Sequence, residues 1–149
     1  MRMYTIKLIE LIEKSKEDIA RQWCNDVARN SRTKSFLSYS DKELMAIATE
    51  IYSTFRELFF SDELKETTRK IFGRYAEDRY KKGIPPHEAI YALILMRRHI
   101  WFYAEFKTVF ISVLEQYQKE ESLNRTILIF DYAVYSIVEK YETLRRSGK

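Results

Sequence analysis

The sequence GIPPHEAIYALILMRRHIWFYAEF, residues 83–106, decides the fold class. Gly83 ends one helical segment, the two prolines that follow form a rigid turn, and Pro86 suits the first position of a new helix. On a helix drawn at about 100° per residue, apolar side chains cover two opposite sides. One side carries Ile90, Leu93, Ile94, Ile100, Trp101 and Ala104, and the other carries Ala92, Met96, Tyr103, Phe106 and Phe110. A helix that is apolar almost all round is buried, so we expect a central helix over about residues 87–117.

Amphipathic segments surround this central helix in the sequence. Helices are expected over about residues 4–13, 15–29, 40–59, 61–82 and 123–145, with a polar loop at 30–39. Ser15 with Asp18, and Ser40 with Glu43, have the spacing of capping boxes that open helices. No stretch alternates with the period of a strand. The sequence therefore predicts an all-α fold, a six-helix bundle with a buried central fifth helix, as one domain over residues 1–149.

The composition excludes several classes of protein. The 26 Lys and Arg residues alternate with 22 Asp and Glu residues, which indicates solvated helix faces and makes a nucleic-acid partner unlikely. The longest apolar runs fall short of the ~20 residues of a membrane span, and no signal peptide is visible. The single cysteine, Cys24, allows no intramolecular disulfide. A cytoplasmic location, away from the membrane, is expected.

No catalytic pattern is present. The sequence has no Gly-rich phosphate loop, no Cys/His cluster with metal-ligand spacing and no nucleophile elbow. The adjacent acids Glu77 and Asp78 diverge on a helix, as do Glu120 and Glu121. We expect no enzyme activity, no metal and no cofactor.

Several short motifs resemble one known family. Besides Trp23, they are SYSDKEL at 38–44, GRYAEDR at 73–79 followed by Gly83, EAI at 88–90 and LMRRHI at 95–100. They resemble the N-terminal domain of stressosome co-antagonists of the RsbR/RsbRD type, a non-haem globin-like sensor domain also found before sensor histidine kinases. The resemblance implies a globin-like arrangement of the helices, a homodimer, and signal input to a kinase or STAS-type output partner.

Two charged residues of the fifth helix are candidate ligand-binding residues. Arg97 falls on an apolar side, where a guanidinium needs an acid, so it either pairs with Asp131 or anchors an anionic ligand. His99 falls on the other apolar side near Tyr103. It is expected to be a hydrogen-bonded core histidine, and a haem ligand is the alternative.

The remaining candidates are aromatic or lie around the turn at Gly83. Tyr75, Trp101 and Tyr103 are candidate ligand contacts, and Trp23 and Trp101 are also expected to anchor the core. Arg79, beside Tyr75, is expected to hydrogen-bond loop carbonyls, with a regulatory contact as the alternative.

The sixth helix suggests a dimer. One face, with Leu123, Ile127, Phe130, Val134, Ile137 and Tyr141, is expected to pack on the fifth helix. Ile129, Tyr132, Tyr135 and Leu144 then remain outside and form a candidate homodimer interface. The alternative is a monomer in which the first helices cover this surface. The expected function is signal input without catalysis; a carrier of a small apolar or fatty-acid-like ligand is the alternative, and a nucleic-acid-binding bundle the third hypothesis.

Overall fold

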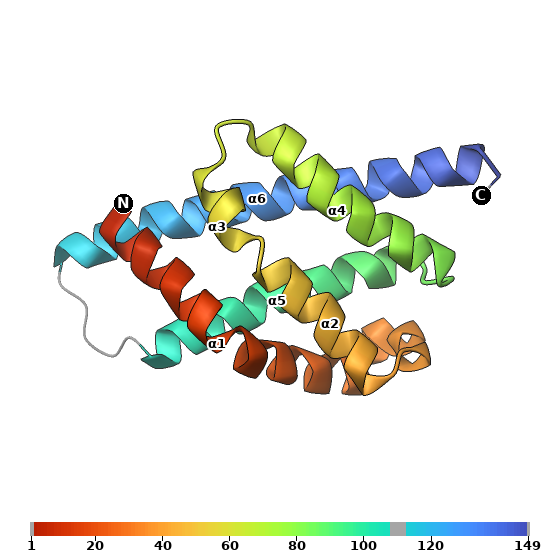
Figure 1. Ribbon diagram of the computed structural model, residues 1–149, viewed down its shortest axis with the longest axis horizontal. Helices are drawn as coiled ribbons and strands as arrows, with labels where there is room; N and C mark the ends of the chain where they lie inside the picture. Colours follow the sequence, from red (N-terminus) through yellow and green to blue (C-terminus); the bar gives the residue numbers. More distant parts are fainter. Residues whose placement is uncertain (1, 108–112, 149) are drawn as a thin grey trace.

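The computed structural model describes residues 2–107 and 113–148, with side chains for 5–104, 117 and 119–148. Its elements are α1 (Arg2–Arg29), the 3₁₀ helix η1 (Ser31–Ser38), α2 (Asp41–Tyr52), α3 (Phe55–Phe60), α4 (Leu64–Lys81), α5 (Pro86–Lys107) and α6 (Val113–Arg146), shown in Figure 1. The described residues form helices and no strands, which confirms the all-α prediction. Six α-helices are present in this part of the chain, but two predicted helices are joined in α1 and one predicted helix is divided into α2 and α3.

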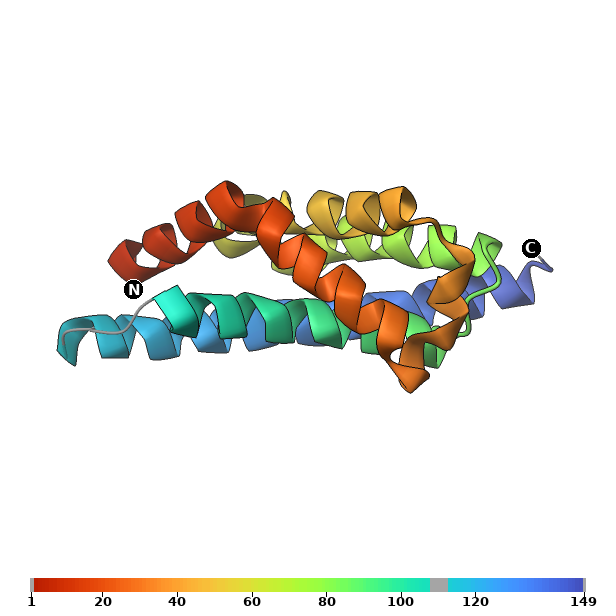
Figure 2. The ribbon, with the colours of Figure 1, turned by 90° about the horizontal axis from the view of Figure 1, so that it is seen from below.

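The helices form two layers. Figures 1 and 2 show α5 and α6 side by side and antiparallel in one layer, while α2, α3, α4 and the first half of α1 lie across them in the other. The second half of α1 runs past the edge of α5 (Figure 2). The closest packing in the described part of the chain joins α4 to α6, α1 to α2 and α1 to α5. Over most of their length, α5 and α6 have no helix on the side opposite α1 to α4 (Figure 2).

The N-terminal helix is longer than predicted. The two helices expected over 4–13 and 15–29 are one continuous helix, α1, so Ser15 caps nothing. No Gly or Pro separates the two segments, and Leu8, Ile12, Ile19 and Trp23 are buried along its length. Spacings of four and seven positions keep these residues on one side of a helix, so packing favours continuation of the helix over the local capping signal.

The expected helix over 40–59 is two helices. Ser40 does open α2, since its hydroxyl accepts from the Glu43 N–H and the Glu43 carboxylate accepts from the Ser40 N–H. The break falls at Ser53 and Thr54, whose hydroxyls donate to the carbonyls of Thr49 and Ile51. Ser and Thr side chains compete for helix carbonyls in this way, and α3 starts in a new direction.

The turn before α5 is as predicted. Gly83 has φ +83°, its N–H donates to Tyr80 O, and the Ile84 N–H donates to Arg79 O. This pair of bonds is a Schellman motif, which ends α4 and suits glycine because the left-handed conformation strains other residues. Pro86 is the first residue of α5.

The fifth helix is central but shorter than predicted. Ala89, Ala92, Leu93, Leu95, Met96, Ile100 and Ala104 are buried, and only His87, Arg98 and Phe102 are exposed among the side chains described on α5. The helix ends at Lys107, and residues 113–117, predicted to belong to it, are the start of α6. Phe110 and the side chain of Phe106 lie outside the described residues.

The predicted loop at 30–39 is mostly the helix η1, with Phe36 fully buried inside. Leu37 of the same segment is 65% exposed. No helix of the described residues is both long and apolar enough to cross a membrane.

Candidate functional site

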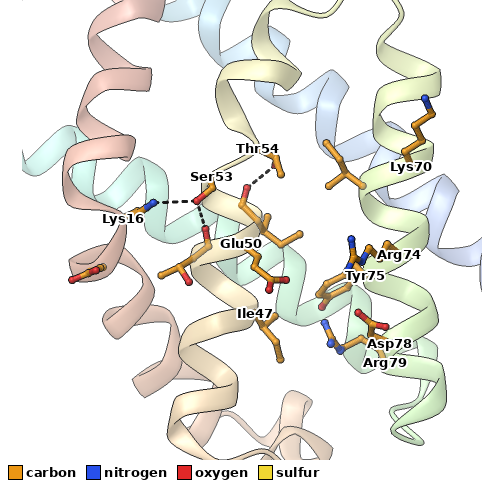
Figure 3. Close-up of a pocket in the computed structure, with 14 residues that line it drawn as sticks. Lys16, Ile47, Glu50, Ser53, Thr54, Lys70, Arg74, Tyr75, Asp78 and Arg79 are labelled. Atoms are coloured by element: carbon orange, nitrogen blue, oxygen red, sulfur yellow. Dashed lines mark hydrogen bonds between the residues drawn. The ribbon is translucent and has the colours of Figure 1, made fainter.

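A groove runs between α2 and α4 on the surface of the four-helix layer. It has a volume of about 700 Å³ and is lined from α1, α2, α4 and the segment joining α2 to α3. Ile47 and Ile51 of α2 and Ile71 and Tyr75 of α4 form its apolar part. Figure 3 shows these two helices facing each other, with Arg74, Tyr75 and Arg79 projecting from α4 toward α2. The volume falls within the range of ~300–1,000 Å³ typical of small-molecule sites.

Arg79 is the chemically notable residue of this groove. It is only 7% exposed, and its Nε donates to the Tyr39 hydroxyl at 2.7 Å. Its guanidinium carbon lies 4.9 Å from the centre of the Tyr75 ring and 5.4 Å from that of Tyr39. In the described part of the chain its terminal nitrogens donate no hydrogen bond and no carboxylate pairs with it. A buried guanidinium with free donors is suited to a carboxylate or phosphate.

The predicted partner of Arg79 was wrong. The sequence suggested loop carbonyls, whereas the guanidinium is held by the two tyrosines. Tyr75 itself is fixed, since its hydroxyl donates to Ala89 O of α5 at 2.7 Å. Burial raises the pKa of Tyr75 and of Tyr39, with the Arg79 charge acting in the opposite direction. Both phenols therefore stay protonated at neutral pH and act as neutral supports for the cation.

The rim of the groove carries mixed charge. Lys70 and Arg74 are exposed cations of α4, Asp78 is an exposed acid one turn after Arg74 on the same helix, and Glu50 is an exposed acid of α2 (Figure 3). With Lys16, Glu17 and Arg79, the lining has four cations and three acids, a net charge of +1. This balance suits a ligand with one negative charge and an apolar body better than a polyanion.

Sequence reasoning found only part of this groove. Tyr75 was a candidate ligand contact and Arg79 a structural or regulatory residue, and the structure brings them together. Ile47, Glu50, Lys70 and Arg74 were missed as site residues. A detectable signal was the repeat of Lys70 and Arg74 one turn apart on the same helix as Arg79, but the facing wall on α2 depends on tertiary packing.

The candidates on α5 lie elsewhere and apart from one another. His99 Nε2 is 2.8 Å from the Asp26 carboxylate of α1, so it is the hydrogen-bonded histidine that was expected. Its Nδ1 is buried without a partner among the described residues. Arg97 makes no ion pair with Asp131: its guanidinium carbon lies 5.9 Å from the Phe130 ring centre, and Asp131 is exposed. That predicted intrachain pair is wrong.

The tryptophans differ. Trp23 is fully buried and its indole N–H donates to Ala92 O at 2.8 Å, which confirms it as a core anchor. Trp101 is half-buried, and its indole N–H has no acceptor in the described part of the structure. Tyr103 is half-buried near the end of α5.

The outer side of α5 and α6 is the second surface of interest. We call it the α5–α6 face. Six of the ten exposed large apolar side chains among the described residues lie on α6, namely Tyr117, Leu123, Ile127, Leu128, Tyr135 and Val138. Ile90, Ile94 and Trp101 of α5 are half-buried beside them. Tyr135 also lines a pocket with residues of α4. Exposed apolar side chains that gather on one helix in this way often mark an interface.

The buried side of α6 is turned relative to the prediction. Ile129 and Leu144, expected outside, are 0% and 7% exposed, while Leu123 and Ile127, expected inside, are exposed. Tyr132 is half-buried and Tyr135 is 68% exposed. The reason is that α6 packs mainly on α4 and buries small polar residues there. The hydroxyls of Thr126 and Ser136 donate to the backbone carbonyls of Ser122 and Tyr132, one turn earlier in α6. These hydrogen bonds allow both polar side chains to be buried.

No cluster of three or more His, Cys, Asp or Glu side chains with metal-binding geometry occurs among the described residues. In comparisons with known proteins, no protein-family model, no curated protein and no solved structure matches the chain. The resemblance to RsbR-type domains therefore stays a prediction.

Proposed function

We propose that the chain is a non-catalytic signal-input domain with a globin-like arrangement of helices. It dimerises through the α5–α6 face and passes a conformational signal to an output domain or partner, such as a kinase or a STAS-type protein. The observation that supports this most directly is the apolar α5–α6 face. Twofold pairing is the commonest way in which soluble proteins cover such a surface.

The arrangement of the layers supports a signalling role. The groove between α2 and α4 lies on one layer, and the α5–α6 face lies on the other (Figures 1 and 2). Between them, α4 packs along α6. Shifts of packed helices by about 1–2 Å are a known way to carry a change from one surface to another. A change in the groove thus has a direct mechanical route to the dimer interface.

Sedimentation equilibrium at micromolar concentration tests the proposal. We expect a dimer that Ile127→Glu dissociates, because it places a charge in the middle of the apolar surface. Leu37→Glu is the matched control, since Leu37 is 65% exposed on η1 and lies outside the face. A monomeric mass for the unaltered chain would contradict the proposal.

A carrier of a small apolar acid is the second candidate function, favoured by Arg79 at the bottom of the groove. Titration with octanoate, followed by amide NMR shifts, tests it against neutral octanol. Binding of octanoate alone, lost in Arg79→Gln and retained in Arg69→Gln, supports a carrier. Arg69 is an exposed arginine of the same helix that lies near Glu66 and Glu139, so it controls for loss of charge.

A further inference from the structure

Two opposite charges, Arg97 of α5 and Asp131 of α6, lie next to Phe130, in space and in sequence respectively, and neither has an ion-pair partner in the described part of the chain. Arg97 of α5 is half-buried with its guanidinium over the Phe130 ring. Asp131 directly follows Phe130 on α6 and is exposed, and it also lines a pocket to which α4 contributes Lys65 and Arg69. Neither makes an ion pair or a hydrogen bond with a described residue. Both charges are solvated while the face is open, and both need a partner once it is covered.

The surroundings of Arg97 are apolar. On α5, Ile94 and Trp101 lie about one turn before and after Arg97. On α6, Ile127 and Val134 lie about one turn before and after Asp131. A second protein that covered these side chains with apolar surface alone would leave a desolvated guanidinium unpaired, which is costly. The face therefore requires an acid from whatever covers it, and it presents an acid itself.

A second copy of this chain meets that requirement. In a twofold dimer every contact between two residues occurs twice, once in each direction. Arg97 and Asp131 both lie next to Phe130, at the same level along the antiparallel α5 and α6. A twofold axis through this point sets each Arg97 opposite the Asp131 of the other copy. The face is thus complementary in charge to itself.

We infer that Arg97 of one copy pairs with Asp131 of the other, twice, around an axis that passes beside Phe130. This inference rests on the proposed dimer and adds its register and the residues that select the partner. The Phe130 ring holds the guanidinium in place before association, which lowers the entropy lost when the pair forms.

Charge reversal in the two positions separately tests the pair. Arg97→Glu sets two acids against each other in its homodimer, and Asp131→Arg sets two cations against each other. We expect each variant alone to raise the dimer dissociation constant by at least about tenfold, since like charges across an interface cost more than 1.4 kcal/mol. Circular dichroism checks that both variants fold.

Mixing the two variants gives the decisive result. In the mixed dimer the glutamate at position 97 of one copy faces the arginine at position 131 of the other. The native Asp131 of the first copy faces the native Arg97 of the second, so both contacts join opposite charges. We expect the mixture to form a heterodimer, seen by native mass spectrometry, with a dissociation constant within about threefold of the unaltered dimer. A pair within one chain cannot produce this outcome. Glu13→Arg mixed with Arg56→Glu is the control, since these exposed residues of α1 and α3 pair within the chain and lie outside the face.

The outcomes separate the inference from the proposed function. A monomeric unaltered chain contradicts the dimer itself. A dimeric unaltered chain whose two variants do not form the heterodimer overturns the pair and leaves the dimer standing. If Arg97→Glu does not fold, Arg97→Gln and Asp131→Asn replace the reversals. Their effects on the dissociation constant must then fall short of additivity in the double variant, and full additivity overturns the inference.

Discussion

The indole N–H of Trp23 donates a 2.8 Å hydrogen bond to the backbone carbonyl of Ala92, which joins α1 to α5 inside the core. Both residues are fully buried. The Trp23 ring also meets the Phe36 ring edge to face, with 6.3 Å between ring centres. One side chain therefore connects α1, η1 and α5.

Replacement of Trp23 should be among the most damaging changes to the fold. We expect Trp23→Ala to lower the free energy of unfolding by about 3–5 kcal/mol, because it leaves a large cavity. Trp23→Phe should cost less but still lose the hydrogen bond, worth about 1 kcal/mol. Trp101→Phe is the control, since Trp101 is half-buried and its N–H has no acceptor among the described residues. Urea unfolding followed by circular dichroism measures all three, and equal losses at the two tryptophans would contradict the assignment.

The two structured glycines should respond to alanine with opposite signs. Gly83 has φ +83°, so Gly83→Ala strains the backbone and should destabilise by about 1–2 kcal/mol. Gly73 lies inside α4 with nothing within 4 Å of where a Cβ would stand. Gly73→Ala should therefore stabilise by about 0.5–1 kcal/mol through helix propensity. Thermal unfolding measures both changes in stability. A change in the same direction for the two variants would contradict the prediction.

Features of the fold that depend on a few neighbouring residues were predictable from the sequence. The capping box of Ser40 and Glu43 and the glycine turn at Gly83 each involve a short run of chain whose chemistry requires one conformation. The same holds for the central helix that begins at Pro86, because its composition alone requires burial.

Features that depend on packing were not predictable. Ser15 with Asp18 has the spacing of a capping box as Ser40 with Glu43 does, yet it lies in mid-helix because buried residues continue on both sides. The buried side of α6 was misplaced for the same reason: Thr126 looks polar in sequence and is 1% exposed in the fold. The groove at Arg79 needs two helices that are distant in sequence.

Cys24 should be an unreactive thiol. It is 2% exposed, and burial raises the pKa of its thiol to about 11. Because the thiolate is the reactive form, we expect modification by a disulfide reagent near pH 8 to be at least about 100-fold slower in the folded protein than in guanidinium chloride. Absorbance of the released thiol measures both rates. Similar rates in the two conditions would show that the α1–α2 contact around Cys24 opens readily.

Two surface ion pairs should contribute to stability against acid. The Arg56 guanidinium donates to Glu13, and that of Arg21 to Asp41, and these bonds lower the pKa of each carboxyl. A lowered pKa in the folded state means that the unfolded chain binds more protons, so the contribution is complete above the ordinary values of 4.5 and 3.8 and is lost as the pH falls below them.

The difference between the urea midpoints at neutral and at acid pH measures this contribution. It should be smaller in the double variant Glu13→Gln, Asp41→Asn than in the unaltered chain. Glu17→Gln is the control, an exposed acid of α1 without an ion pair in the described structure, and it should leave the difference unchanged. An unchanged difference in the double variant would show that solvent screens both pairs fully.

Glu88 holds η1 against the start of α5. It is 4% exposed, and its two carboxylate oxygens accept from the backbone N–H and the hydroxyl of Ser35, both at 2.7 Å. Short bonds to an ionised acceptor are the stronger kind. This contact therefore fixes a 3₁₀ segment that contains the non-helical Thr33.

Glu88→Gln should release η1 while the rest of the fold persists. Glutamine keeps the size of the side chain but presents an NH₂ group to one of two donors, so one bond is lost and the other is weakened, with an expected cost of about 1.5–3 kcal/mol. Because η1 lies at one end of the molecule, the loss should appear first as local opening rather than as global unfolding. Hydrogen exchange of the Ser35 amide should become faster by at least about tenfold in Glu88→Gln, whereas amides of the core of α5 change no more than global stability requires.

Ser35→Ala is the matched control: it removes the hydroxyl bond and leaves the N–H bond, so the amide at position 35 should stay protected. Equal protection in Glu88→Gln and in the unaltered chain would mean that backbone geometry alone holds η1, and that Glu88 is replaceable.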